Sequence, residues 1–447
     1  MKITEFQEKL LQKAMDAGFK EAEVYYEKAE SFQCMIFEGE IDSYETSVDG
    51  GLSLRGLYNG KMGYAYTEKI DEDSISFLID NAKANADVLD EDDGTDIFDG
   101  SSEYTKYQSY SEELANVQIS EKIKLIKSIE EKIRAYDPRI VTLDYCVLHE
   151  FSGEQSLANS KGLSLTEKKN GLIIFVSTVV KDGEEMKTGS FRKMTRDFQT
   201  LDADEIAKEA AEEALSNLGE KSIPSGKYPI IMRHNAAASL LSIFTPIFSA
   251  ENAQKDQSLL KGKVGTQVAS NLVTVLNDPF HPEALSGSNF DGEGVATKKQ
   301  AIISNGTLET LLHNRKSAKL EGCVTTGNAH KPSYKSTLSI APQNMYIATG
   351  ERTLDDLLVS VSEGILITDL SGLHSGTNTI SGDFSVEATG FHIKEGKIAS
   401  PVKQMTIAGN FYELMKDIEE TCTDLYFLPD GYGSPSLLVK ELSVTVD

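Results

Sequence analysis

The first 17 residues carry apolar side chains at every third or fourth position, and this spacing predicts an amphipathic helix that ends near Gly18. The pattern then changes to shorter alternating runs, which predict strands at residues 22–28, 31–38, 40–47, 51–57 and 61–67. Asp49-Gly50-Gly51 and Asn59-Gly60 predict hairpin turns between strands, because Gly and Asn tolerate positive φ. A helix over residues 74–86 is predicted to complete the first part of the chain.

A second α+β part follows from the periodicity of residues 111–221. Isoleucines at 123, 126, 129 and 133 predict a helix over residues 121–136. Strands are predicted near residues 139–151, 155–159, 163–168, 172–180 and 186–195. Asp202 is expected to cap a further helix that runs to residue 217.

The two prolines in residues 222–229 mark the predicted boundary to a third part, since proline continues neither a helix nor a central strand. Beyond it the pattern is rich in β-structure with Gly-containing turns, and helices are expected near residues 235–249, 353–363 and 409–419. The sequence therefore predicts an α+β fold, with a mixed α/β N-terminal half (β-meander and helices) and a β-rich C-terminal domain. The expected divisions are residues 1–110, 111–221 and 222–447.

Charge restricts the classes of partner. The chain of 447 residues has a net charge of −26, which opposes binding to nucleic acid and to anionic membrane surfaces. The acidic run at residues 87–103 is interpreted as a solvated loop.

Several features predict a cytoplasmic protein without a membrane span. Glu5 and Glu8 lie where a secretory signal would carry its apolar core, and the longest apolar stretch, residues 236–250, is too short to cross a bilayer. The four cysteines are far apart and form neither a CxxC pair nor a disulfide framework, which fits a reducing compartment.

Zinc-protease chemistry is the first candidate, and His149-Glu150 begins like such a motif. A second histidine one helical turn later is required so that both imidazoles face one ion, and none follows. His149 is therefore interpreted as a residue on the face of a strand.

Two other groups of polar residues could carry chemistry. Asp291 and Glu293 flank Gly292 and could form a cation site, although a solvated β-turn is the favoured interpretation. His374, Ser375 and Asp383 lie in a Gly-rich segment that could form an acyl-transfer site. A substrate-lining loop is the favoured interpretation of that segment.

Several motifs spread over the chain resemble the TldD/PmbA family, and within it the PmbA (TldE) branch. They are SAENAQK at residues 249–255, SLLKGKVG at 258–265, DGEG at 291–294, TGN at 326–328, SGDFS at 381–385, and GK at 396–397 with PVK at 401–403. The central stretch, residues 288–328, contains two of these motifs around a strand pair turned by Asn305-Gly306. The resemblance extends over nearly the whole chain.

The resemblance implies a two-component, metal-dependent cytoplasmic peptidase that acts on unfolded or extended peptides. In that family, TldD-type chains bind the metal with HExxxH on a helix and a later cysteine, whereas PmbA-type chains share the fold without these ligands. The family's older label, modulator of DNA gyrase, reflects a genetic effect.

The sequence departs from the metal-binding pattern at both places. The HExxxH region falls near residues 242–247, SIFTPI, which contain no His or Glu, and no cysteine follows Cys422. The expectation is therefore no metal ligand and no cofactor in this chain, with zinc only in a TldD-type partner. Whether the chain is itself an enzyme stays open.

Partners and site residues follow from the same resemblance. A TldD-like subunit in a heterodimer, or a second copy in a homodimer, is expected as the partner, with peptides as substrates. The residues expected to line the peptide channel are Asp291, Glu293, Asn328, His374 and Asp383. The alternatives are a self-sufficient hydrolase that uses His374, Ser375 and Asp383, and a non-enzymatic interaction protein of the gyrase-modulator type.

Overall fold

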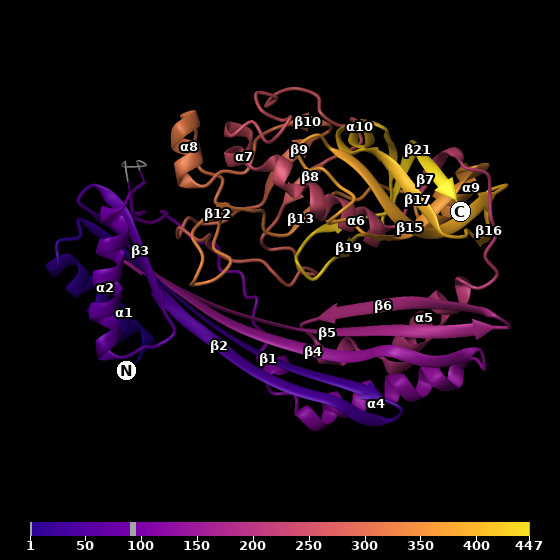
Figure 1. Ribbon diagram of the computed structural model, residues 1–447, viewed down its shortest axis with the longest axis horizontal. Coiled ribbons are helices and arrows are strands. Elements are labelled where there is room, and N and C mark those ends of the chain that lie inside the picture. Colours follow the sequence, from indigo (N-terminus) through magenta and orange to yellow (C-terminus); the bar gives the residue numbers. More distant parts are fainter. Residues whose placement is uncertain (1, 90–94, 447) are drawn as a thin grey trace.

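The computed structural model describes residues 2–89 and 95–446, and a long, curved antiparallel sheet dominates its N-terminal half (Figure 1). The order of strands is β3-β2-β1-β4-β5-β6. Their bounds are β1 (Glu21–Phe37), β2 (Glu40–Tyr58), β3 (Lys61–Thr67), β4 (Ile140–Asn159), β5 (Ser164–Asp182) and β6 (Glu185–Thr195). Strands on both sides of residue 110 thus belong to one sheet.

The strands are longer than the sequence predicts. The runs predicted at residues 22–28 and 31–38 are one strand, β1, and β4 and β5 likewise each join two predicted runs. The hydrophobic alternation fades in the middle of this sheet because no helix within residues 2–89 and 95–446 covers it there, whereas backbone pairing continues (Figure 1). The turn at Asn59-Gly60 is confirmed, with positive φ at both residues.

The hairpin turn predicted at Asp49-Gly50-Gly51 is wrong. β2 runs straight through these residues, and Gly50 and Gly51 pair with Lys28 and Glu27 of β1. A Cβ on Gly51 would lie 2.4 Å from the Tyr334 ring and 2.6 Å from the carbonyl oxygen of Thr67. Gly51 therefore permits a close approach rather than a turn.

Helices cover the two ends of the long sheet. At one end, α1 (Ile3–Asp16) and α2 (Glu72–Asp87) bury their apolar faces, including Leu10 and Leu78, against β1, β2 and β3. At the other end, α4 (Ile119–Tyr136) and α5 (Ala203–Ser216) bury Ile129 and Ala210 against β1, β4 and β5. The predicted cap of α5 is confirmed, since the Asp202 carboxylate accepts from the backbone N–H of Asp204. We propose residues 1–110 and 111–221 as two parts on the basis of these helix pairs.

The C-terminal part contains a closed β-barrel. Strands β14, β7, β21, β17 and β15 pair in this order, and β14 also pairs with β15, so the ring closes. Their bounds are β7 (Gly226–Met232), β14 (Glu363–Ser371), β15 (Asp383–Lys394), β17 (Met405–Asn410) and β21 (Leu437–Val446), with β16 (Lys397–Pro401) and β18 (Ile418–Thr421) attached. The α+β prediction with a β-rich C-terminal domain is confirmed.

Shorter elements complete this part. A second sheet has the order β10-β9-β8-β13-β20-β19, and its strands are β8 (Val275–Asn277), β9 (Gln300–Ser304), β10 (Thr307–Leu308), β13 (Met345–Ile347), β19 (Tyr426–Phe427) and β20 (Gly433–Ser434). β11 (Ala329–His330) pairs with β12 (Ser339–Ile340).

Short helices occur in both halves of the described chain. In the N-terminal half they are α3 (Glu112–Ala115) and η1 (Phe198–Thr200), and in the C-terminal part they are α6 (His234–Phe244), η2 (Thr245–Phe248), α7 (Ala250–Gln254), α8 (Arg315–Glu321), α9 (Leu354–Ser360) and α10 (Phe411–Lys416).

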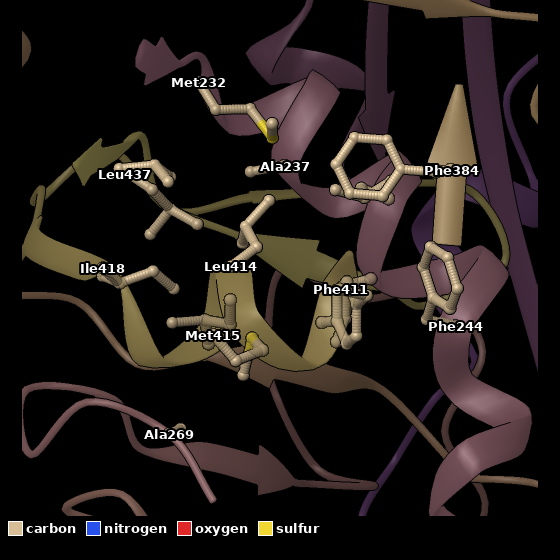
Figure 2. Packing of buried hydrophobic residues seen from close by; sticks show 14 of the residues in the cluster. Met232, Ala237, Phe244, Ala269, Phe384, Phe411, Leu414, Met415, Ile418 and Leu437 are labelled. Atoms are coloured by element: carbon tan, nitrogen blue, oxygen red, sulfur yellow. The ribbon is translucent and has the colours of Figure 1, made fainter. Parts of the chain in front are cut away.

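Aromatic packing holds α6 and α10 against the barrel. The rings of Phe244 and Phe411 stack with centroids 4.5 Å apart, and Phe384 of β15 meets Phe244 edge-on (Figure 2). Met232, Leu414 and Met415 belong to the same buried cluster. Such aromatic pairs add about 0.5–1.5 kcal/mol beyond the burial of their area.

Loops of the C-terminal part lie on the middle of the long sheet. Glu167 of β5 accepts a hydrogen bond of 2.9 Å from the backbone N–H of Asn289, and Gln155 of β4 donates one of 3.1 Å to Ser288. Tyr64 of β3 donates one of 2.9 Å to the carbonyl oxygen of Ser336. Polar side chains of the sheet therefore form hydrogen bonds with the loops of residues 288–336.

The acidic run at residues 87–103 falls only partly among the described residues, because residues 90–94 lie outside them. The rest of the run is not simply solvated. Ile97 is fully buried, and its N–H donates to the carboxylate of Glu21. Across residues 2–89 and 95–446, no helix is both long and apolar enough to cross a bilayer.

Candidate functional site

A cleft between the long sheet and the C-terminal part converges on Lys331, which follows β11. Lys331 lines three neighbouring cavities with volumes of 540, 170 and 200 Å³. The largest also contains Arg55 and Glu293, and its walls include the apolar side chains of Met62 and Leu338. Concave sites with apolar walls and a few converging charges are typical of ligand-binding sites.

Two tyrosines from the sheet hold the Lys331 ammonium group. Its nitrogen lies 5.2 Å from the ring centroid of Tyr25 and 4.7 Å from that of Tyr64. It donates hydrogen bonds to the Tyr64 hydroxyl at 3.2 Å and to the Ser336 carbonyl oxygen at 2.9 Å. Burial, together with the nearby charge of Arg55, lowers the pKa of Lys331 to about 8 against the opposing effect of Glu23.

A buried ion pair forms the floor of the cleft. Arg55 of β2 donates through Nε to Glu23 of β1 at 3.1 Å, and its Nη2 lies 2.9 Å from the same oxygen. The second carboxylate oxygen of Glu23 and Nη2 of Arg55 have no hydrogen-bond partner within the described residues. Both atoms are shielded from solvent, so the pair supports the wall of the cleft from behind.

Asp291 is a buried turn residue rather than the solvated one that the sequence favours. It is 2% exposed, and its carboxylate accepts from the backbone N–H groups of Glu293, Val295 and Ala329 at 2.9, 3.0 and 3.0 Å. Burial and the neighbouring Glu293 raise the pKa of Asp291, while the three N–H donors oppose this rise. Asp291 thereby joins the DGEG loop to β11.

Glu293 and Asn328 are also buried in this region. The Glu293 carboxylate accepts from the backbone N–H of Arg315 at 2.8 Å, and Glu293 lines the 540 Å³ cavity. Asn328 accepts from Gln300 at 3.0 Å and donates to the Ala341 carbonyl oxygen at 3.2 Å. The fold thus brings together Asp291, Glu293 and Asn328 from the predicted channel residues.

The other predicted residues lie in a separate region: His374 and Ser375 are on the loop between β14 and β15, and Asp383 is the first residue of β15. His374, Ser375 and Asp383 are exposed. Ser375 donates to the carbonyl oxygen of Gly372 at 3.2 Å, and the Asp383 carboxylate accepts from Ser381 and Asn410. No hydrogen bond joins His374 to Ser375 or Asp383, all of which lie within the described residues 95–446. The three side chains therefore do not have the geometry of a nucleophile, its base and an orienting acid.

Family models match most of this chain. Residues 22–86 match PmbA/TldA metallopeptidase domain 1, residues 112–218 match the central domain, and residues 225–446 match the C-terminal domain. The chain belongs to the PmbA/TldD metallopeptidase family.

Individual relatives agree with this assignment. An uncharacterized protein from Methanocaldococcus jannaschii is 33% identical over 417 residues, which cover 92% of this chain and 93% of the relative. The metalloprotease TldD homolog and the metalloprotease PmbA homolog of Haemophilus influenzae are each 25% identical, covering 95% and 90% of this chain and 92% and 88% of their own lengths.

Solved structures share the same fold. A crystal structure from Thermotoga maritima, described as a modulator of a DNA gyrase, has a TM-score of 0.92 and 33% identity, and covers 99% of this chain and 100% of that one. TldE from Thermococcus kodakarensis has a TM-score of 0.91, with 98% and 100% covered. At 22% identity, the second likeness concerns the fold alone.

The place where metal ligands of TldD-type chains are expected lies at the end of α6. The helix stops at Phe244 and η2 begins at Thr245, as Pro246 predicts. Ser242 donates a hydrogen bond of 3.2 Å to the Asp430 carboxylate, and burial raises the pKa of Asp430. The two polar side chains that meet at this PmbA/TldD position, Ser242 and Asp430, therefore offer a hydroxyl and a carboxylate, which are both oxygen donors.

Neighbouring histidine and cysteine side chains are occupied elsewhere. His234, at the start of α6, stacks on Tyr426 at 4.8 Å, and burial lowers its pKa to about 4. It precedes Ser242 by eight residues, or about 12 Å along a helix. Cys422 is fully buried, and burial raises its pKa to about 12.

Lys331, Arg55 and Tyr64 are not among the residues predicted from the sequence. Arg55 gave no signal, because in the alternating run LSLRGL at residues 52–57 it shares the polar face with Ser53, where an exposed arginine is ordinary. Lys331 follows the TGN motif by three residues, but no local pattern indicates that two tyrosines from distant strands surround it.

Proposed function

We propose that this chain is the subunit without the family's metal centre in a PmbA/TldD-type metallopeptidase that acts on unfolded or extended peptides. The catalytic zinc and bond cleavage belong to a TldD-type partner, while this chain shapes the peptide passage and stabilises the partner. The partner is a TldD-like chain in a heterodimer, and a second copy of this chain is the alternative.

The observation that carries the proposal is the donor set at residues 242–247 and Asp430. A catalytic zinc is held by three protein ligands, among which imidazole and thiolate predominate, and it activates a bound water. Here Ser242 and Asp430 bond to each other, and the helix that would aim two imidazoles at one ion ends at Phe244. These groups do not fit zinc in its family position.

The open edge of the long sheet supports peptide capture. β2 pairs with β3 only from Leu52 to Tyr58, and no strand among the described residues pairs with its outer edge from Glu40 to Gly50. An extended peptide can add to such an edge through backbone hydrogen bonds, which accept many sequences. Glu40, Asp42 and Glu45 make this edge acidic, so basic peptides are favoured.

The cleft at Lys331 supports the same role. The Lys331 ammonium presents positive charge between apolar walls, which suits a peptide carboxylate or main-chain carbonyl groups. Asp291, Glu293 and Asn328 hold the loops that form this cleft, in agreement with a place beside the peptide passage.

The test is to purify the chain alone and together with a TldD-type chain that carries HExxxH, and to assay cleavage of an unfolded peptide. We expect no cleavage by the chain alone, and cleavage by the pair that a chelator abolishes. Robust, chelator-resistant cleavage by the chain alone would overturn the proposal and favour the His374 loop. Failure to bind any peptidase chain would favour the interaction protein.

A further inference from the structure

The segment around α8 brings an imidazole, a carboxylate and a thiol together. His313 precedes the helix, Glu321 is its last residue, and Cys323 follows Gly322, whose φ of 67° is left-handed. This reversal returns the chain, so that the Cys323 N–H bonds the Ala318 carbonyl oxygen at 3.0 Å. The Nε2 atom of His313 then lies 3.8 Å from Cys323 Sγ and 3.6 Å from Glu321 Oε2.

The imidazole is buried and held in one orientation. His313 is 3% exposed, and its Nδ1 lies 3.2 Å from the Ser317 hydroxyl. That hydroxyl donates its hydrogen to the Asn314 carbonyl oxygen at 3.3 Å, so its oxygen can accept a hydrogen bond from a protonated Nδ1. Nε2 then carries the free lone pair, as in metal-ligating histidines. Cys323 Sγ lies 4.0 Å from Nδ1 as well as 3.8 Å from Nε2, so the exposed Cys323 side chain has to rotate to reach the lone-pair direction of Nε2.

The carboxylate is oriented as well. The Oε1 atom of Glu321 accepts a hydrogen bond of 3.2 Å from the Gln254 amide, and the same amide donates to the Ser317 carbonyl oxygen at 2.9 Å. The second oxygen, Oε2, therefore faces His313. Both the histidine and the glutamate thus have supporting partners that do not themselves point at the common centre.

We propose that His313 Nε2, Glu321 Oε2 and Cys323 Sγ bind one zinc ion or another thiophilic divalent cation. The three ligand atoms lie within 4.8 Å of one another. Zinc–ligand bonds of about 2.0–2.3 Å in tetrahedral geometry place ligand atoms about 3.3–3.5 Å apart, so zinc binding requires the exposed side chains of Cys323 and Glu321 to close by up to about 1 Å through rotation. One carboxylate and one thiolate would balance the charge of the ion.

Three protein ligands leave a fourth coordination position for water or a small ligand. Cys323 also lines a cavity of 350 Å³ together with Arg315 and Thr325, which offers room for that ligand. The site is separate from residues 242–247, and it does not depend on the proposed role as a peptidase subunit. The sequence did not indicate it, since the spacing of seven residues between His313 and Glu321 matches no zinc motif.

The test uses the full chain, stripped with a chelator and titrated with zinc against a chromophoric competitor. We expect one zinc per chain, and at least tenfold weaker binding for Cys323→Ser and for Glu321→Gln. Both side chains are exposed, so these variants should fold, which circular dichroism would check. His374→Gln, at an exposed histidine on the other loop, is the matched control and should bind zinc like the wild type.

Cobalt provides a second readout. Substitution with Co²⁺ should give a sulfur-to-metal charge-transfer band in the wild type and in His374→Gln, and this band should be lost in Cys323→Ser. Zinc binding by Cys323→Ser that equals the wild type, or no zinc bound by the stripped chain at micromolar concentration, would overturn the proposal.

Discussion

The ammonium nitrogen of Lys331 lies 4.7 Å from the ring centroid of Tyr64 and 3.2 Å from the hydroxyl oxygen of the same residue. Lys331 comes from the C-terminal part and Tyr64 from the third strand of the long sheet, so this contact joins the two halves of the chain. The charge state of the Lys331 amine affects both the stability of this junction and the kind of ligand that the cleft can hold.

Stability should depend on pH through Lys331. Burial lowers its pKa from 10.5 to about 8, so between these pH values the unfolded chain binds more protons than the folded chain. The free energy of unfolding should therefore rise with pH in this window, by about 1–3 kcal/mol. Urea unfolding at pH 7.5, 9 and 10.5 would measure this rise. Lys331→Met should flatten it, and an unchanged slope in that variant would contradict the assignment.

Gly51→Ala should destabilise the protein by about 1–3 kcal/mol, because the new Cβ would overlap atoms that cannot all move. It would lie 2.4 Å from the Tyr334 ring and 2.6 Å from the backbone oxygen of Thr67. Gly226→Ala is the matched control: it adds a Cβ no closer than 3.7 Å to its nearest neighbour, and its effect should stay within about 0.5 kcal/mol. Urea unfolding measures both, and equal effects would contradict this account of Gly51.

Asp291→Ala should cost about 2–4 kcal/mol of folding free energy, because three buried backbone N–H groups lose their acceptor. Asp291→Asn retains Oδ1, which accepts from Glu293 and Val295, and should cost less. Thermal unfolding of the two variants at pH 7 tests this order. A loss in Asp291→Asn as large as that in Asp291→Ala would mean that the charge, rather than the acceptor geometry, is what matters.

Peptide binding should protect the outer edge of β2 from hydrogen exchange. An added strand would bond amide groups between Glu40 and Gly50, which have no strand partner on that side among the described residues. Exchange measured with and without an unfolded basic peptide should slow there, and raising the ionic strength should weaken the effect because the edge is acidic. Slowing confined to β6, the opposite edge strand, would place the peptide elsewhere.

The local pattern predicted most helices and turns because short-range chemistry decides them. The isoleucine spacing at residues 121–136 and the cap at Asp202 predicted α4 and α5 closely. Asn305-Gly306 predicted the hairpin of β9 and β10, which turns with positive φ at both residues. The long strands were predicted in pieces, since the polar middle of the sheet carries no hydrophobic alternation although its backbone pairing is complete.

The candidate site, like the fold, was predicted only in part from the sequence. Family motifs in the sequence indicated Asp291, Glu293 and Asn328, which the fold gathers beside one cleft. The sequence placed His374 and Asp383 with them, yet the structure puts His374 on the exposed loop after β14 and Asp383 at the exposed start of β15. Proximity in sequence cannot fix how loops from different sheets are arranged.

The sequence by itself determined the family, the α+β class and the lack of imidazole and thiol at residues 242–247, because these depend on residue identity and short spacing. Only the tertiary structure decided that Lys331 meets Tyr25 and Tyr64, or that Cys323 returns to His313. The first contact joins residues more than 260 positions apart in the chain, and the second depends on the left-handed turn at Gly322. Burial and close approach of this kind arise from packing, which no local pattern encodes.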